Sequence, residues 1–112
     1  MTDGELDQFD VDKLIEKACK MNLPDLIQYC TDQSNWVDKS ISENPFERGS
    51  QYTVRRYRDF VHGLLFLAKG YKAKPSTMRN EDFPKTKKIF ESLVAKKQVA
   101  ADWLSVYENW NG

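Results

Sequence analysis

The stretch Gln51–Lys69, QYTVRRYRDFVHGLLFLAK, constrains the fold more than any other part of the chain. Its apolar residues recur at the spacing of one helix face, and additional apolar residues make its second half hydrophobic nearly all round. Arginines surround its first half instead. A helix segment that is hydrophobic nearly all round is typical of the centre of a bundle. We therefore predict a central helix over 51–69.

Local signals predict two helices in the first thirty residues. Asp10 is a suitable N-cap, and the apolar stripe behind it predicts a helix that ends near Met21. Asn22 can cap a second helix, with Pro24 in the first turn, where its missing N–H costs nothing. The apolar stripe of this second helix runs to Cys30.

Residues 31–50 are rich in Ser, Asn and Asp, which favour turns, although several large apolar residues interrupt them. A structureless segment of this length is unusual in a compact domain. We therefore predict a short helix near 34–42, a turn over 43–49 and an N-cap for the central helix at Ser50.

After the central helix the sequence predicts a polar, basic connector over 70–83, with Gly70 as the helix stop. Asp82 followed by Pro84 marks the next helix start. The apolar stripe that follows is interrupted at Lys96-Lys97-Gln98 and then resumes. The segment is one long helix or two, and we favour a break near Lys97.

No segment shows sustained two-residue alternation of apolar and polar side chains, so strands are not expected. The sequence predicts an all-α fold, a single compact helical bundle of about four to six helices around the central helix. Residues 10–112 are expected to form this one domain. Residues 1–9, which are polar and acidic, are expected to form a disordered tail.

The net charge of zero hides two oppositely charged halves. Residues 1–50 contain eleven acidic and five basic residues, a net charge of −6, and residues 51–112 contain twelve basic and six acidic residues, a net charge of +6. This asymmetry indicates either two faces with different partners or halves that neutralise each other in the fold.

The two cysteines, Cys19 and Cys30, provide no disulfide framework, and no signal peptide accompanies them. We therefore expect a cytoplasmic protein with reduced thiols. The longest apolar block, 63–68, is far shorter than the about 20 apolar residues that span a bilayer, so no membrane association is expected.

Signals for catalysis are weak. His62 is the single histidine, which leaves nucleophilic and general-base chemistry with one candidate. The Cys and His residues lack the close spacing of a zinc site, and no glycine-rich phosphate loop precedes a helix. We expect no catalytic residue, no metal and no cofactor.

The best functional signal is the interleaving of basic and aromatic residues from Gln51 to Lys97, where twelve basic and four acidic residues lie. The residues that we expect to contact a partner or a nucleic acid are Arg55, Arg56, Arg58, Lys69, Lys72, Lys74, Arg79, Lys85 and Lys88. Candidate aromatic contacts are Trp36, Tyr52, Tyr71 and Trp110.

The leading hypothesis is a non-catalytic accessory or regulatory protein that docks on a larger macromolecular assembly, nucleoprotein assemblies included, with a protein as its partner. The alternative is direct binding of RNA or DNA through phosphates, with little sequence specificity because no groove-reading motif is present. A small enzyme is the distant alternative.

Overall fold

The structure, a computed structural model, describes residues 9–43 and 48–110, with side chains for 9–43 and 52–110. Within these residues the chain is helical and contains no strand. The α-helices are α2 (Val11–Ala18), α3 (Leu23–Glu43), α4 (Arg48–Ala68), α5 (Lys87–Ala95) and α6 (Ser105–Glu108), and two short 3-10 helices are η2 (Phe83–Thr86) and η3 (Ala101–Leu104). The predicted compact all-α fold is confirmed.

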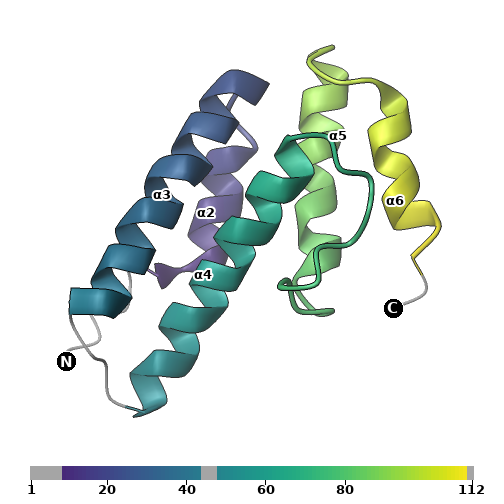
Figure 1. Ribbon diagram of the computed structural model, residues 1–112. Helices are drawn as coiled ribbons and strands as arrows, with labels where there is room; N and C mark the ends of the chain where they lie inside the picture. Colours follow the sequence, from purple (N-terminus) through teal and green to yellow (C-terminus); the bar gives the residue numbers. More distant parts are fainter. Residues whose placement is uncertain (1–8, 44–47, 111–112) are drawn as a thin grey trace.

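The long helices α3 and α4 lie side by side and antiparallel (Figure 1). Helix α2 lies behind them, α5 lies on the other side of α4, and α6 forms the outer edge. Helix α4 therefore lies between α3 and α5, and it is central as predicted. The turn after α2 contacts α5 directly, because Ser92 Oγ donates to the Cys19 carbonyl at 2.8 Å. Its buried residues are Val54, Tyr57, Phe60, Val61, Gly63, Leu64, Leu67 and Ala68.

The ends of α4 agree only in part with the prediction. The helix begins at Arg48 rather than at residue 51, so Arg48 and Gly49 are helical and Ser50 lies inside the helix. The predicted cap at Ser50 is therefore wrong, and the rest of the predicted turn, 44–47, lies outside the described residues. At the other end Gly70, with φ of 95°, stops the helix as predicted.

Helix α2 begins where its cap predicts. The Asp10 carboxylate accepts a hydrogen bond from the backbone N–H of Lys13 at 3.1 Å. The helix ends at Ala18, earlier than the predicted Met21. Phe9, which falls in the expected tail, is buried and stacks on Trp36 with ring centroids 4.9 Å apart. The prediction of disorder is therefore wrong for Phe9, and 1–8 lie outside the described residues.

Helix α3 is one continuous helix of 21 residues, so the predicted end near Cys30 and the separate short helix at 34–42 are wrong. Two of the polar side chains find hydrogen-bond partners within the helix: the Thr31 and Ser40 hydroxyls donate to the carbonyls of Ile27 and Trp36 at 2.8 Å. Packing against α4 supplies the remaining stability, because Cys30, Ser34 and Val37 are buried.

The connector, residues 70–82, returns along α4 and is anchored to it. A Cβ atom at Gly63 would lie 2.8 Å from Met78 Cε and 3.1 Å from Met78 Cβ, so only glycine lets the connector lie this close. Pro75 and Met78 are buried at this point. Further along, buried Asp82 pairs with Arg56. The anchor positions Gly70, Gly63 and Arg56 are seven residues, two helical turns, apart.

The C-terminal region is broken as predicted. Lys97 adopts a φ of 61° after α5, and the chain then forms η3 and α6. No residue of η3 or α6 is fully buried. These short helices attach through aromatic rings: Tyr107 stacks on Phe83 at 4.9 Å, and Trp103 lies 6.1 Å from Phe90. Within the described residues, no helix combines the length and the apolar character needed to cross a bilayer.

Candidate functional site

Arg56, one of the expected contact residues, is committed to the fold. Its Nε donates to Asp82 Oδ2 at 3.0 Å, and its Nη2 binds Asp82 Oδ1. Asp82 is 1% exposed and also lies 3.8 Å from Lys85 Nζ. Hydrogen bonding to Asp82 raises the pKa of Arg56. The helix start expected at Asp82 is confirmed, because η2 begins at Phe83 directly after it, but the Asp82 carboxylate reaches α4 and makes no cap hydrogen bond.

Five more of the expected basic residues have internal partners. Arg58 pairs with Asp38 at 2.9 Å, Lys72 with Asp102 at 2.5 Å, and Lys85 with Asp12 at 3.7 Å. Lys74 donates to the carbonyls of Pro75 and Met78, and the Arg79 guanidinium lies 4.7 Å from the centre of the Tyr52 ring. The acidic and basic halves of the sequence thus partly neutralise each other.

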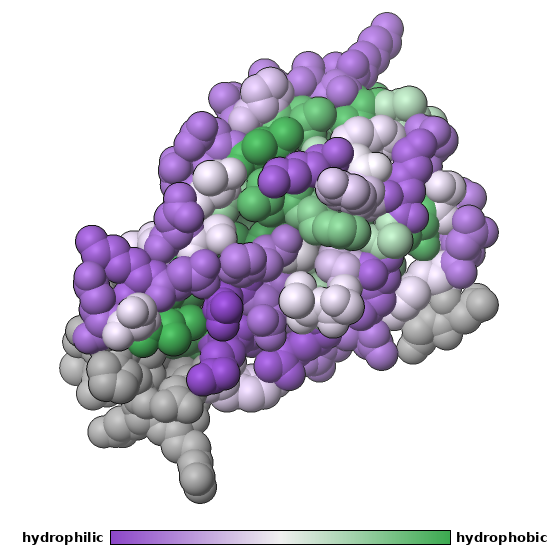
Figure 2. Space-filling view, viewed as in Figure 1, coloured by the Kyte–Doolittle hydropathy of each residue, from purple (hydrophilic) through white to green (hydrophobic). Residues whose placement is uncertain are grey.

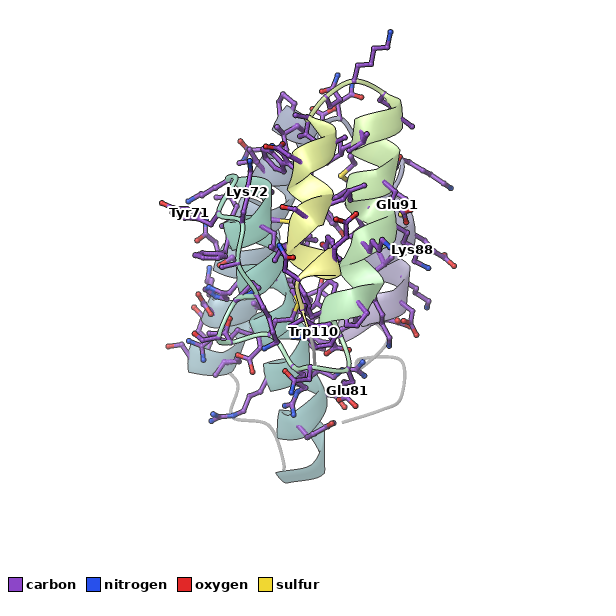
Figure 3. All side chains as sticks on the ribbon, turned by 90° about the vertical axis from the view of Figure 1, so that its right-hand side faces the viewer. Tyr71, Lys72, Glu81, Lys88, Glu91 and Trp110 are labelled. Carbon is purple, nitrogen blue, oxygen red and sulfur yellow. The ribbon has the colours of Figure 1, made fainter. Side chains whose placement is uncertain are left out.

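The remaining three, Arg55, Lys69 and Lys88, are exposed and have no ion pair among the described residues. They do not form one patch. Figure 3 places Tyr71 and Lys72 on one side of α6, and Lys88 with Glu91 on the other. The basic surface expected from the sequence is therefore divided by the C-terminal helix and by internal ion pairs.

Two of the four candidate aromatic residues are strongly exposed and two are partly covered. Tyr71 is 58% exposed and Tyr52 is 54% exposed. Trp36 is partly buried between Phe9 and Tyr57, and Trp110 meets the edge of Phe83 at 5.1 Å.

The Tyr71 ring stacks on Phe66 of α4, with centroids 4.6 Å apart and an interplanar angle of 13°. Phe66 itself is partly exposed. Figure 2 shows apolar side chains gathered on this face, over the end of α4 and its seam with α3, and framed by hydrophilic residues. The partly exposed apolar residues of these segments include Ile27, Leu65 and Phe66. An exposed apolar patch with a polar rim is typical of an interaction surface.

His62 lies in a polar cluster at the α3–α4 seam that contains a serine and an aspartate. Its Nε2 is 3.2 Å from Ser34 Oγ and 3.3 Å from Asp38 Oδ2. A nucleophilic triad uses one ring nitrogen for the serine and the other for the carboxylate. Here both partners contact the same nitrogen, so the cluster lacks the proton relay and is better explained as a link between helices.

Groups that hold metals are not found within 9–43 and 48–110, where no three His, Cys, Asp or Glu side chains converge. The two thiols are free, and burial raises the pKa of both: that of Cys30, which is fully buried, rises to about 12.

No family model matches this chain, and comparison with curated proteins and with solved structures finds no significant similarity.

The sequence did not predict the α3 residues that contact the basic side chains of α4. Ser34 and Asp38 on α3 face His62 and Arg58 on α4. The two residues on each helix are four positions, or one helical turn, apart. This matched spacing was the available signal, but it has meaning only once the two helices are known to be antiparallel. Phe66 belongs to the apolar block 63–68, and periodicity alone does not show that its side chain is partly exposed.

Proposed function

We propose that the protein is a non-catalytic docking protein that binds an acidic, partly apolar segment of a partner protein. The surface is the α4 docking face, which consists of Arg55, Arg58, His62, Phe66, Lys69 and Tyr71. One observation carries the proposal: the Tyr71 ring, 58% exposed, is held flat on Phe66. A preformed aromatic anchor loses little conformational entropy when a partner covers it.

The charge of α4 favours an acidic partner. Two of its arginines, Arg56 and Arg58, are paired with Asp82 and Asp38, so the charge available to a partner comes from other cations of this face. Arg55 and Lys69 lie at opposite ends of the docking face and have no ion pair among the described residues. Cations at both ends of an apolar centre complement a segment with acidic residues around an aromatic or aliphatic one.

Two further features belong to this proposal. The free thiols of Cys19 and Cys30 support a reducing, cytoplasmic setting. The single-nitrogen contacts of His62 support a role without catalysis. Direct binding of RNA or DNA is less well supported, because six of the nine expected cations already have partners inside the protein.

The test is a nuclear magnetic resonance titration of the labelled protein with a short peptide of Glu, Leu and Phe. The same peptide with Gln in place of Glu controls for charge. We expect saturable shifts at Lys69 and Tyr71 with the acidic peptide and weaker binding of the neutral one. Tyr71→Ser should weaken binding on the order of tenfold, the effect of losing an anchor residue.

Tyr52→Ser is the matched control, because Tyr52 is similarly exposed but lies outside the docking face. Equal effects of the two substitutions would contradict the proposal. Single-stranded oligouridine is titrated in parallel. If oligouridine binds and its affinity falls steeply with salt while the peptide does not bind, the nucleic-acid alternative replaces the docking proposal.

A further inference from the structure

A hollow of about 370 Å³ lies between α2 and α3, and residues from α2, α3 and α4 line it. It shares no residue with the α4 docking face. Its volume falls within the range of about 300–1,000 Å³ that small-molecule sites occupy. Such sites combine an apolar wall with a few convergent polar groups, and both are present here.

The apolar wall is aromatic. Trp36 and Tyr57 both line the hollow, and their rings meet edge to face with centroids 6.2 Å apart. Tyr57 is buried, and Trp36 is partly exposed. Phe9 stacks on Trp36 and supports it. Trp36 supplies most of the fixed ring surface against which a planar ring can pack, because Tyr57 is only 2% exposed.

The polar groups on the floor are hydrogen-bond donors. The Tyr57 hydroxyl donates to Gln33 Oε1 at 2.7 Å, which fixes the Gln33 side chain and leaves its amide NH₂ without a partner among the described residues. Tyr29 also lines the hollow. Burial raises the pKa of both phenols, so both remain protonated and neutral at physiological pH.

Two cations complete the site. Lys13 and Lys17 lie one helical turn apart on α2 and line the same hollow. Both are exposed, and neither has an ion pair within the described residues. Like charges at this spacing repel each other, and a bound anion between them removes the repulsion. The Asp10 carboxylate also lines the hollow, and it accepts a hydrogen bond from the backbone N–H of Lys13.

We infer that this hollow binds a small planar aromatic anion. The ring packs against Trp36 and Tyr57, and the anionic oxygens accept hydrogen bonds from Lys13, Lys17 and the Gln33 amide. The charged group is a carboxylate or a phosphate, which share this chemistry. The inference goes beyond the docking function and does not depend on it.

The experiment compares matched pairs of probes on the labelled full-length protein by nuclear magnetic resonance. Indole-3-acetate is paired with neutral indole-3-acetamide, and adenosine monophosphate with adenosine. We expect the anion of at least one pair to bind saturably, with shifts at Lys13, Tyr29, Gln33 and the Trp36 indole, and to bind on the order of tenfold more tightly than its neutral analogue. The anion that binds more tightly, indole-3-acetate or adenosine monophosphate, shows whether the charged group is a carboxylate or a phosphate.

The double variant Lys13→Gln with Lys17→Gln should remove this preference for the anion and leave the weak binding of the neutral probe unchanged. The control is Lys20→Gln with Lys97→Gln, which changes the net charge equally outside the hollow. All four exchanged positions are exposed, so the spectrum of each variant should keep the native dispersion.

The inference is overturned by any of three results: no saturable shift with either anion, equal affinity for charged and neutral probes, or equal loss in both double variants. Failure here leaves the peptide titration of the docking face unaffected, because the two sites share no residue.

Discussion

The guanidinium of Arg56 and the carboxylate of Asp82 form a two-point pair in which the acid is 1% exposed and the base 29% exposed. The pair joins α4 to the end of a connector that has no regular structure of its own. A carboxylate buried to this extent is stable only while its cation is present. The pair therefore holds the connector in place rather than offering a charge to solvent.

Replacing Arg56 with Ala should lower the free energy of unfolding by about 3 kcal/mol, because it leaves the buried Asp82 with only the more distant Lys85. Arg55→Ala is the matched control: Arg55 is exposed, and its loss should change stability by less than about 0.5 kcal/mol. Urea unfolding measures both. Similar values for the two variants would show that the pair contributes little.

Gly63→Ala should destabilise the protein by about 1–3 kcal/mol, the usual cost of overpacking. In an open helix the same substitution stabilises by roughly 1 kcal/mol. The sign reverses here because the new Cβ would lie 2.8 Å from Met78 Cε and 3.1 Å from Met78 Cβ, closer than carbon atoms normally pack. Thermal unfolding measures the sign. A more stable variant would mean that the connector moves away freely.

Tyr107→Phe should lower the free energy of unfolding by about 1 kcal/mol. The buried Thr86 hydroxyl donates to the Phe83 carbonyl, so the Tyr107 hydroxyl donates to Thr86. The phenylalanine keeps the ring stacked on Phe83 and removes only this bond. Tyr71→Phe serves as the control, because the exposed Tyr71 hydroxyl has no protein partner among the described residues. Chemical unfolding distinguishes the two.

Stability should fall at alkaline pH, and Cys30 should account for part of the fall. Burial raises the pKa of Cys30 from its ordinary 9.0 to about 12. The unfolded chain therefore loses this proton at lower pH than the folded protein, so the thiol's stabilising contribution is complete below pH 9 and is lost as pH rises toward 12. The slope is at most about 1.4 kcal/mol per pH unit.

Urea unfolding of Cys30→Ala across this pH range provides the measurement. The variant should be less stable at neutral pH, because the substitution leaves a cavity, but its stability should decline less steeply with rising pH than that of the wild type. A residual decline is expected, because burial also raises the pKa of Tyr57 and Tyr107. Parallel curves for the two proteins would contradict a role for the thiol.

Features that depend on neighbouring residues could be predicted from the sequence. The cap at Asp10, the stop at Gly70 and the break near Lys97 each follow from the conformational preferences of a few adjacent residues. The central helix was also predictable, because its apolar periodicity is long and strong.

The course of α3 could not be predicted in the same way. Its second half has the composition of a loop, and what keeps it helical is burial of Cys30, Ser34 and Val37 against α4. That contact brings together residues more than twenty positions apart, as the bond from Tyr57 to Gln33 does. Local propensity contains no information about such a partner.

The candidate site could be predicted only in part, because it too depends on contacts between residues far apart in the sequence. The sequence shows which residues are basic, but the fold decides which of them are neutralised. Arg55 and Arg56 are adjacent and chemically identical, yet Arg55 is exposed and Arg56 is paired with a buried acid 26 positions away. The hollow lined by Lys13, Gln33 and Trp36 depends on three helices and has no sequence motif.

The anchoring of the connector along α4 has a consequence for how this protein can change. The connector is fixed at three points: at Gly70, at the contact of Met78 with Gly63, and at the pair of Asp82 with Arg56. On α4 these points are two helical turns apart, and the helix is rigid. The number of residues between them must therefore match the distances along the helix. Loops usually tolerate insertions and deletions, but here a change of even one residue between anchors would pull Asp82 or Met78 from its partner. Substitutions at exposed positions of the connector are therefore tolerated much more readily than insertions or deletions.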